Sequence, residues 1–433
     1  MRKFITILIL AVSATTGRAQ TSPIITTDID HFWEAYDKIV TSSDSAEQYA
    51  YLDKYFLQKG SAGLAAMRQR RNYTPQSYIN AIHQYPLYWQ AIRSKMFRVQ
   101  EYASAIGRYV GELKKLYPAL RPSRIYFTVG AFRSGGTTLD SMVLIGSEIA
   151  MADETVPTDE FAKTFPNLVS FLKTGPVHHL VFTNVHEYVH TQQKTTVGNT
   201  LLAQSVLEGV AEFMAEKATG QLSTAPALSY GPAHFERVRA VFAQQMLNPF
   251  TTFWLYSDEE NEFGMRDLGY YVGHAICKGY YEKASDKQRA ISTMIELDYN
   301  NEAALTAFVN QSGYLEKPVD AYRGDYERTR PYVTGISGIG SDSTAVTPGT
   351  LSITIHFSEP LDKHYRNFEL GPLGKEHLLR ITSFKGFSED GRSISFEVAP
   401  EAGQHYQLVI GERFRSAKGI SLKPYLVDFT TRK

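Results

Sequence analysis

The chain has 433 residues, enough for two or three domains with sizeable hydrophobic cores. Its 45 lysine and arginine residues balance 45 aspartate and glutamate residues, so the formal net charge is zero. This balance argues against a bulk electrostatic attraction to nucleic acid or to an anionic membrane, and partners must be recognised at local sites.

The first nineteen residues have the pattern of a secretory signal peptide. Arg2 and Lys3 precede an apolar run over residues 4–14, and small residues end at Ala19, where cleavage is expected. A buried N-terminal helix is the alternative. No stretch reaches the roughly eighteen apolar residues of a transmembrane helix. Because Cys277 is the only cysteine, no internal disulfide can form. We expect an exported bacterial protein, periplasmic or secreted.

Aromatic and other apolar residues recur three and four apart from about residue 20 to residue 120, which predicts a helical N-terminal region. Two β-rich runs follow, residues 125–129 and 142–149, joined by a glycine-rich loop. A short antiparallel sheet is the simplest interpretation. Helical patterns return over residues 159–313, so residues 121–325 are expected to form one mostly helical domain with a small sheet.

A polar stretch over residues 320–335 has the composition of a linker. After it the period changes to two, and apolar residues alternate with polar ones from Leu351 to Phe357 and in later runs. The segments "SITIHFSEPLD" and "SISFEVAPEAGQHYQLVIG" resemble bacterial immunoglobulin-like modules of exported and surface-layer proteins. The resemblance implies an immunoglobulin-like β-sandwich over residues 334–433 that acts as a spacer or accessory module. The expected fold class is α+β.

The stretch "VFTNVHEYVHTQQK", residues 181–194, places His186 and His190 four residues apart. On a helix these residues project from one face, so both imidazoles can bind one metal ion. Glu187 lies about 100° around the helix, close enough to act on a water at that ion. A catalytic zinc needs three protein ligands and an open position, so a third ligand must come from elsewhere.

Three arrangements can supply that ligand. The metzincin pattern needs a glycine and a histidine where this chain has Gln193 and Thr196, and the GTxxD-like segment of the aspartate-ligand pattern is absent. In the third arrangement a following helix brings a glutamate. The segment "LEGVAEF" provides Glu208 after a turn at "TVGN". Glu208 is therefore the predicted third ligand.

With this glutamate the chain resembles the gluzincin metallopeptidases, the HExxH…E group that includes thermolysin-like and aminopeptidase N-like enzymes. Residues 208–211, "EGVA", are similar to the E-G-x-A segment of the aminopeptidase group. The resemblance implies zinc held by the two histidines and Glu208, with Glu187 as the general base. It also implies that Glu212 hydrogen-bonds a zinc-binding histidine and orients its ring.

Gluzincins stabilise the oxyanion with a tyrosine or histidine from a helix after the third ligand. The segment "LGYYVGHAICKGYY" offers Tyr270, Tyr271 and His274 for this role, and ordinary packing of an aromatic helix is the alternative. The strand in "DSMVLIGSEIA" is the candidate to pair with an extended peptide, and an ordinary strand of the sheet is the alternative. The aminopeptidase G-x-M-E-N segment, which holds a free amino end, is absent, and this argues against an aminopeptidase.

The sequence thus predicts an exported zinc peptidase that hydrolyses a peptide or protein substrate, with Zn²⁺ as its cofactor and no nucleic-acid partner. A non-catalytic binding or adhesion protein on the same scaffold is the second interpretation. Glu187 argues against it, because a structural zinc site has no use for a general base beside the metal.

Overall fold

The computed structural model describes residues 24–257, 259, 261–339 and 346–433, and the predicted signal peptide lies outside them. The fold is mixed α+β, with antiparallel sheets toward the C-terminus. The chain divides into two compact units, Met1–Thr191 and Gln192–Lys433. In the part of the chain that the structure describes, no helix is long and apolar enough to cross a membrane. The domain limits expected from the sequence remain predictions.

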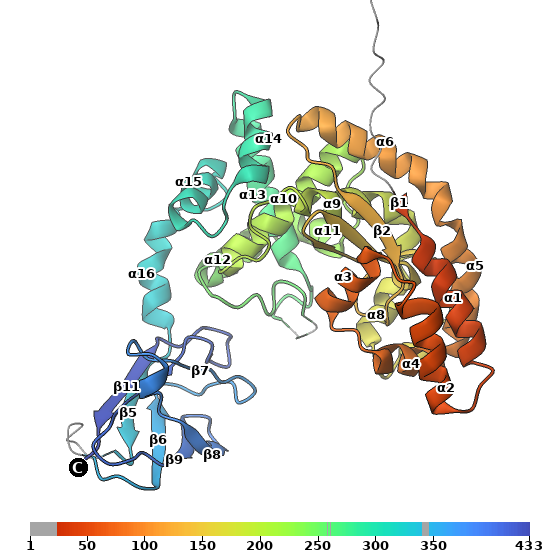
Figure 1. Ribbon diagram of the computed structural model, residues 1–433. Helices are drawn as coiled ribbons and strands as arrows, with labels where there is room; N and C mark the ends of the chain where they lie inside the picture. Colours follow the sequence, from red (N-terminus) through yellow and green to blue (C-terminus); the bar gives the residue numbers. More distant parts are fainter. Residues whose placement is uncertain (1–23, 258, 260, 340–345) are drawn as a thin grey trace, which may run out of the picture. The chain divides into compact units, whose positions relative to one another are not determined.

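The first unit begins with β1 (Ile24–Ile25) and a run of short helices, coloured red to orange in Figure 1. Polar caps start several of them: Asp44, Ser61 and Thr74 each accept a backbone N–H of the first turn. Their apolar faces bury a cluster of aromatic rings, with Phe32 and Trp89 at 4.8 Å between ring centroids. The helices of this part of the chain are α1 (Thr27–Ile39), α2 (Ser45–Leu52), α3 (Ala62–Arg71), α4 (Pro75–Gln84), α5 (Pro86–Met96) and α6 (Gln100–Leu116).

The small sheet of the first unit is mixed, so the antiparallel sheet expected from the sequence is wrong in its main pairing. The strand order is β1-β2-β4-β3. β2 (Arg124–Thr128) pairs in parallel with β1 and with β4 (Met142–Gly146). The glycine-rich loop itself supplies β3 (Gly136–Leu139), which is antiparallel to β4 and forms the other edge. The expectation that the strand in "DSMVLIGSEIA" pairs with a peptide is wrong, because that strand is β4 and both of its sides are already paired, with β2 and β3. The connection is long enough to carry the chain back before β4 begins, and that makes the parallel pairing possible.

Three further helices complete this unit: α7 (Ser147–Ala150), α8 (Pro166–Leu172) and α9 (Leu180–His190). Helix α9 packs on β3, β4 and α6, while α1 and α3 pack on β2. The HExxH motif therefore lies on a helix held directly against the edge strand of the sheet.

The second unit opens with helices, and its first pair is the most closely packed. α10 (Leu201–Thr219) begins at the Thr200 cap and ends at Gly220, whose φ of 68° lies in the left-handed region. Its partner is α13 (Leu268–Lys283), seen beside it in Figure 1. The other helices are α11 (Pro226–Ala233), α12 (Phe235–Gln245), α14 (Lys287–Glu296), α15 (Glu302–Ser312) and α16 (Val319–Thr329).

Helix α16 occupies most of the stretch that the sequence suggested to be a linker. The helix has a small buried face, formed by Val319 and Tyr326, which lie seven residues apart. The charged side chains that gave this stretch the composition of a linker form ion pairs along the helix, such as Arg328 with Asp325. A mostly polar helix gives little hydrophobic periodicity, which explains the error.

Two antiparallel sheets follow, over residues 333–433, and we call this region the β-domain. One has the order β5-β6-β9-β8 and the other β11-β10-β7. Apolar side chains of both sheets form one hydrophobic core, and the alternation predicted for β6, β9, β10 and β11 is confirmed. The strands are β5 (Val333–Ser337), β6 (Leu351–Phe357), β7 (Phe368–Glu369), β8 (Ile381–Phe387), β9 (Ser393–Val398), β10 (His405–Ile410) and β11 (Tyr425–Thr430).

Candidate metal centre

Helix α9 presents His186 and His190 on one face, as the four-residue spacing requires. Their Nε2 atoms lie 3.0 Å apart, and the rings meet edge to face at 80°. His186 is 7% exposed, so its imidazole is almost entirely removed from solvent. Two ring nitrogens this close together can both bind one cation that lies to the side of the line joining them.

The C-terminal end of α9 is fixed by hydrogen bonds to the segment before β2. The Tyr188 hydroxyl accepts the Ser123 N–H at 2.8 Å and donates to the Arg121 carbonyl at 3.3 Å. The Arg121 guanidinium in turn donates to the carbonyl of Thr191 at 2.9 Å. These bonds hold the turn that carries His190, so its imidazole does not depend on a free helix end for its position.

Glu187 lies against the edge strand β3. A Cβ atom placed on Gly136 would lie only 3.0 Å from Oε1 of Glu187 and 3.2 Å from its Cγ. Glycine therefore leaves room for this carboxylate beside the strand. The carbonyl of Gly136 accepts the Ser134 hydroxyl at 2.7 Å and lies 3.4 Å from an Arg71 guanidinium nitrogen, which fixes the strand at this point.

Helix α10 is buried along nearly its whole length, and it carries several polar side chains inward. Glu208 is 6% exposed, and a buried carboxylate is costly unless it is hydrogen-bonded or bound to a cation. Its Oε1 accepts the hydroxyl of Tyr256, which comes from the loop between α12 and α13. The amide of Gln204, one turn earlier on α10, donates to the same hydroxyl at 2.7 Å.

The predicted ligands His186, His190 and Glu208 form a group whose donor atoms all lie within 4.8 Å of one another. Two imidazole nitrogens and a carboxylate oxygen are a donor set that catalytic zinc uses. Tetrahedral bonds of about 2.0–2.1 Å place two ligand nitrogens roughly 3.3 Å apart, close to the 3.0 Å between the two Nε2 atoms. The side chains present therefore fit a zinc ion.

Glycines bring α10 and α13 into backbone contact. A Cβ atom on Gly209 would lie 2.0 Å from the carbonyl carbon of Gly273, and one on Gly273 would lie 1.7 Å from the carbonyl oxygen of Ser205. No side chain fits in either place. The glycine of "EGVA" and the glycine three residues after Tyr270 thus have a common physical reason, since both allow this close helix crossing.

The three side chains proposed to stabilise the oxyanion lie in three different environments. The ring of Tyr270 meets Tyr256 edge to face at 6.2 Å, and the Glu208 carboxylate is close enough to influence the Tyr270 hydroxyl electrostatically. Tyr271 is 6% exposed and packs against Gly231, where a Cβ would lie 2.2 Å from its ring. His274 lies 2.8 Å from Glu216, two turns along α10 from Glu208.

The His274–Glu216 pair is an interhelical contact. Burial acts to raise the pKa of Glu216, but the hydrogen bonds from His274 and from the Ser223 N–H lower this pKa below its ordinary value. By contrast, burial raises the pKa of Tyr270 well above its usual value. Of the three candidates, Tyr270 is the one whose pKa is also raised by the nearby Glu208 carboxylate.

Sequence patterns do not reveal Tyr256, because it belongs to an irregular loop 48 residues after Glu208. One partial signal was available: Gln204 precedes Glu208 by one helical turn, and a polar residue there belongs to the same face. That face of α10 therefore carries Gln204 as well as Glu208, one polar residue more than the "EGVA" segment indicates.

A family model described as "Predicted Zn-dependent protease (DUF2268)" matches residues 168–301. The match covers the helices that carry His186, His190, Glu208 and Tyr270, and it supports a zinc-dependent protease. No curated protein sequence matches the chain.

Among solved structures, the S-layer protein rSbsC matches at 13% identity, over 94% of this chain and 45% of that one. The chain therefore spans less than half the length of that protein. The TM-score is 0.19, too low to carry an argument about the fold.

Proposed function

We propose that the protein is a zinc-dependent peptidase of the gluzincin type, exported through its N-terminal signal peptide, with an immunoglobulin-like β-domain. The observation that carries the proposal is the group of His186, His190 and Glu208 with donor atoms within 4.8 Å. The description of the matching family, a predicted zinc-dependent protease, supports the same reaction class.

In this proposal His186, His190 and Glu208 hold the ion. Zinc, when bound, lowers the pKa of a coordinated water toward neutrality and polarises the substrate carbonyl. Glu187 accepts the proton of the attacking water and then donates it to the leaving amine as the peptide bond breaks. Its position beside Gly136 places the carboxylate at the strand edge, where an extended peptide can lie.

Two further roles belong to the same proposal. The Tyr270 hydroxyl is the donor to the developing oxyanion, since it lies close enough to the Glu208 carboxylate for the two to interact electrostatically, and Tyr271 and His274 are the other candidates for this role. Glu212 is buried one turn after Glu208, where it orients one of the zinc-binding imidazoles.

The test combines metal analysis with hydrolysis of a mixed peptide library by the purified full chain. We expect about one zinc per chain and cleavage that stops when a chelator removes the metal. Glu187→Gln should keep its zinc and lose hydrolysis by a factor of at least about 100. Glu101→Gln, which changes an exposed carboxylate paired with Arg98, is the matched control and should cleave at the normal rate.

A wild-type chain that binds no zinc would contradict the whole site assignment. A chain that binds zinc but cleaves no peptide, in any condition in which it is folded, would instead favour the binding or adhesion protein. Equal hydrolysis by wild type and Glu187→Gln would remove Glu187 from the reaction while leaving the metal ligands in place.

A further inference from the structure

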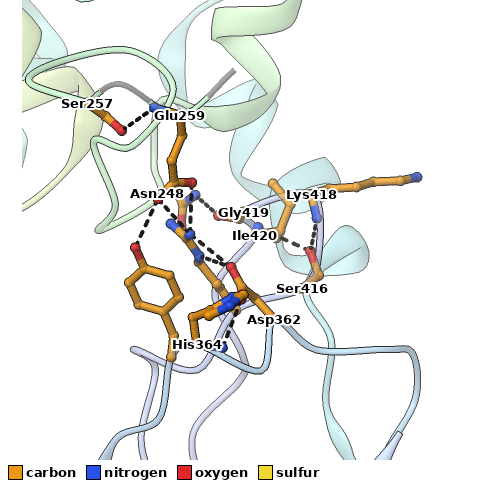
Figure 2. A network of polar contacts seen from close by, with 11 residues as sticks. Asn248, Ser257, Glu259, Asp362, His364, Ser416, Lys418, Gly419 and Ile420 are labelled. Carbon is orange, nitrogen blue, oxygen red and sulfur yellow. Dashed lines mark hydrogen bonds and ion pairs between the residues drawn. The ribbon is translucent and has the colours of Figure 1, made fainter. Parts of the chain in front are cut away.

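An arginine of the β-domain lies at the contact with the loop between α12 and α13, which the structure describes at residues 246–257, 259 and 261–267. Arg415 is 1% exposed, and its guanidinium Nη2 lies 2.9 Å from Oδ2 of Asp362 and 3.2 Å from Oε2 of Glu259. Asp362 belongs to the β-domain and Glu259 to the loop, and Figure 2 shows both carboxylates within one network of polar contacts. The buried Arg415 guanidinium therefore forms ion pairs with both the loop and the β-domain.

Aromatic rings surround the same guanidinium. It lies 3.6 Å from the ring centroid of Tyr365, and Phe250 and Phe253 of the loop lie at 5.5 and 5.7 Å. The Tyr365 hydroxyl donates to Glu259 at 3.1 Å. Glu259 supplies the only carboxylate of the described loop residues in this ion pair, and movement of the loop would break its contact with Arg415, so the pair favours a single position of the loop.

A second contact lies near the start of the loop. The Asn248 side-chain amide donates to the carbonyl of Gly419 in the β-domain, as Figure 2 shows. The backbone carbonyl of Asn248 accepts the N–H of Leu201, at the first turn of α10. One residue thus connects the β-domain to the helix that carries Glu208.

The loop has a strained backbone at three residues that are not glycine. Phe253, Tyr256 and Asp267 have φ values of 73°, 60° and 62°, in the left-handed region. The N–H of Tyr256 donates to Oδ1 of Asp267 at 2.8 Å, which ties two of these residues together. Such conformations cost free energy and persist only where surrounding contacts impose them.

The hydroxyl of Tyr256, a residue of this strained loop, lies at the proposed metal ligand Glu208. Tyr256 donates to Oε1 of Glu208 and accepts from Nε2 of Gln204 at 2.7 Å. Oε1 of Gln204 in turn accepts the Gly198 N–H at 2.7 Å. A chain of three hydrogen bonds thus runs from the backbone at residue 198 to the carboxylate, and its direction fixes the rotation of that carboxylate.

We propose that the β-domain helps to position a ligand of the metal centre. Arg415 holds the loop between α12 and α13 in place, and the Tyr256 hydroxyl of that loop orients the carboxylate of Glu208. This inference rests on the proposed function, because Glu208 must be a zinc ligand for its orientation to matter. Tyr256 and Arg415 are positioning residues, which act on the affinity for the ion rather than on substrate. A β-domain that is only a spacer would leave the zinc affinity unchanged when the contact is broken.

The first experiment measures the zinc dissociation constant of the full chain by competition with a chelator. Tyr256→Phe removes the hydroxyl and keeps the ring, and we expect zinc binding to weaken roughly tenfold or more, as for other groups that orient a ligand. Tyr406→Phe is the matched control, since its hydroxyl accepts the Glu401 N–H within the β-domain. The control should bind zinc like the wild type.

The second experiment breaks the contact with the β-domain. Glu259→Ala removes the bridging carboxylate and leaves the Arg415–Asp362 pair intact, so it tests the coupling without opening the β-domain itself. We expect zinc binding to weaken about three- to tenfold, and we expect this loss to disappear when Tyr256→Phe is already present, because both changes act through one hydroxyl. Arg392→Gln, at an exposed arginine of the β-domain, is the control.

Circular dichroism and thermal unfolding establish that each variant is folded. If Glu259→Ala binds zinc as tightly as the wild type, or if its loss adds fully to that of Tyr256→Phe, the coupling is refuted while the proposed function stands. If the wild type binds no zinc, both are refuted. Failure of the inference and failure of the proposed function therefore give different results.

Discussion

Glu148 is a buried carboxyl in the first unit that lies outside the proposed chemistry. It is 0% exposed and is the second residue of α7, the short helix that follows β4. Its carboxylate accepts the N–H of Gly130 at 2.9 Å and that of Phe132 at 3.3 Å, the loop residues that lead to β3. Burial raises its pKa to about 7, and these two hydrogen bonds only partly offset the effect.

This raised pKa predicts a pH-dependent stability. The folded chain keeps the Glu148 proton up to about pH 7, whereas the unfolded chain releases it near the ordinary glutamate pKa of 4.5. The stabilisation is therefore fully present below the unfolded pKa, and it is lost as the pH rises through the folded pKa. The loss is about 3 kcal/mol in the free energy of unfolding.

Glu148→Gln has no proton to lose, so its unfolding free energy relative to wild type should improve by about that amount between pH 4.5 and 7. Denaturant unfolding of both chains at a series of pH values measures the difference. Parallel curves over this range would show that Glu148 does not titrate there.

At the same scale, the sequence predicts candidate site residues that lie on periodic helices and misses a candidate that lies in an irregular loop. His186, Glu187 and His190 follow from a four-residue spacing, and Glu208 follows from the next helical pattern. Tyr256 lies in a loop without periodicity, and its place on Glu208 depends on contacts with residues far along the chain. Such contacts leave no local signal in one sequence.

At the scale of elements, the crossing of α10 and α13 should be intolerant of any side chain. Gly273→Ala places a methyl group where the Ser205 carbonyl oxygen lies, at 1.7 Å, so the helices must move apart. We expect a loss of about 1–3 kcal/mol or more in unfolding free energy. Gly111→Ala on α6 is the matched control, because nothing lies within 4 Å of its Cβ, and it should be neutral or slightly stabilising.

The edge strand β3 gives a prediction about rate. In Gly136→Ala the new methyl group would lie 3.0 Å from Oε1 of Glu187, so the carboxylate must shift by a few tenths of an ångström. We expect a roughly tenfold lower kcat with little change in thermal stability, since proton transfer depends on position. Gly135→Ala, whose Cβ meets Ile149 instead, should keep the kcat. Equal kcat values in the two variants would show that the fit of Glu187 against β3 does not affect the rate.

The elements themselves were predicted with uneven success, and the reason is physical. The alternation in β6 and β9 was clear because one face of each strand is buried in a core. The parallel pairing of β2 with β4 could not be predicted, because both strands are apolar in succession and their direction is set by β3, a strand of only four residues. Helix α16 was missed because few of its residues are buried.

At the scale of the whole molecule, a bound metal should add to global stability. An ion held by the folded chain but not by the unfolded chain stabilises by about 2.7 kcal/mol at a hundred times its Kd. Chelation should therefore lower the Tm, and added zinc should restore it. Glu187→Gln should show the same shift, because Glu187 is not among the proposed ligands, whereas Glu208→Gln should show a much smaller one. Differential scanning fluorimetry measures all three, and an unchanged shift in Glu208→Gln would remove Glu208 from the ligand set.

The buried arginine between the loop and the β-domain also limits how these parts can be recombined. A shortened chain that ends before the β-domain would leave Phe250, Phe253 and Glu259 without the surface that covers them. A gene fusion that attached a different β-module would bring no cation to the Glu259 carboxylate. Helical part and β-domain are therefore exchangeable only as a matched pair, in protein engineering and in the shuffling of gene segments alike.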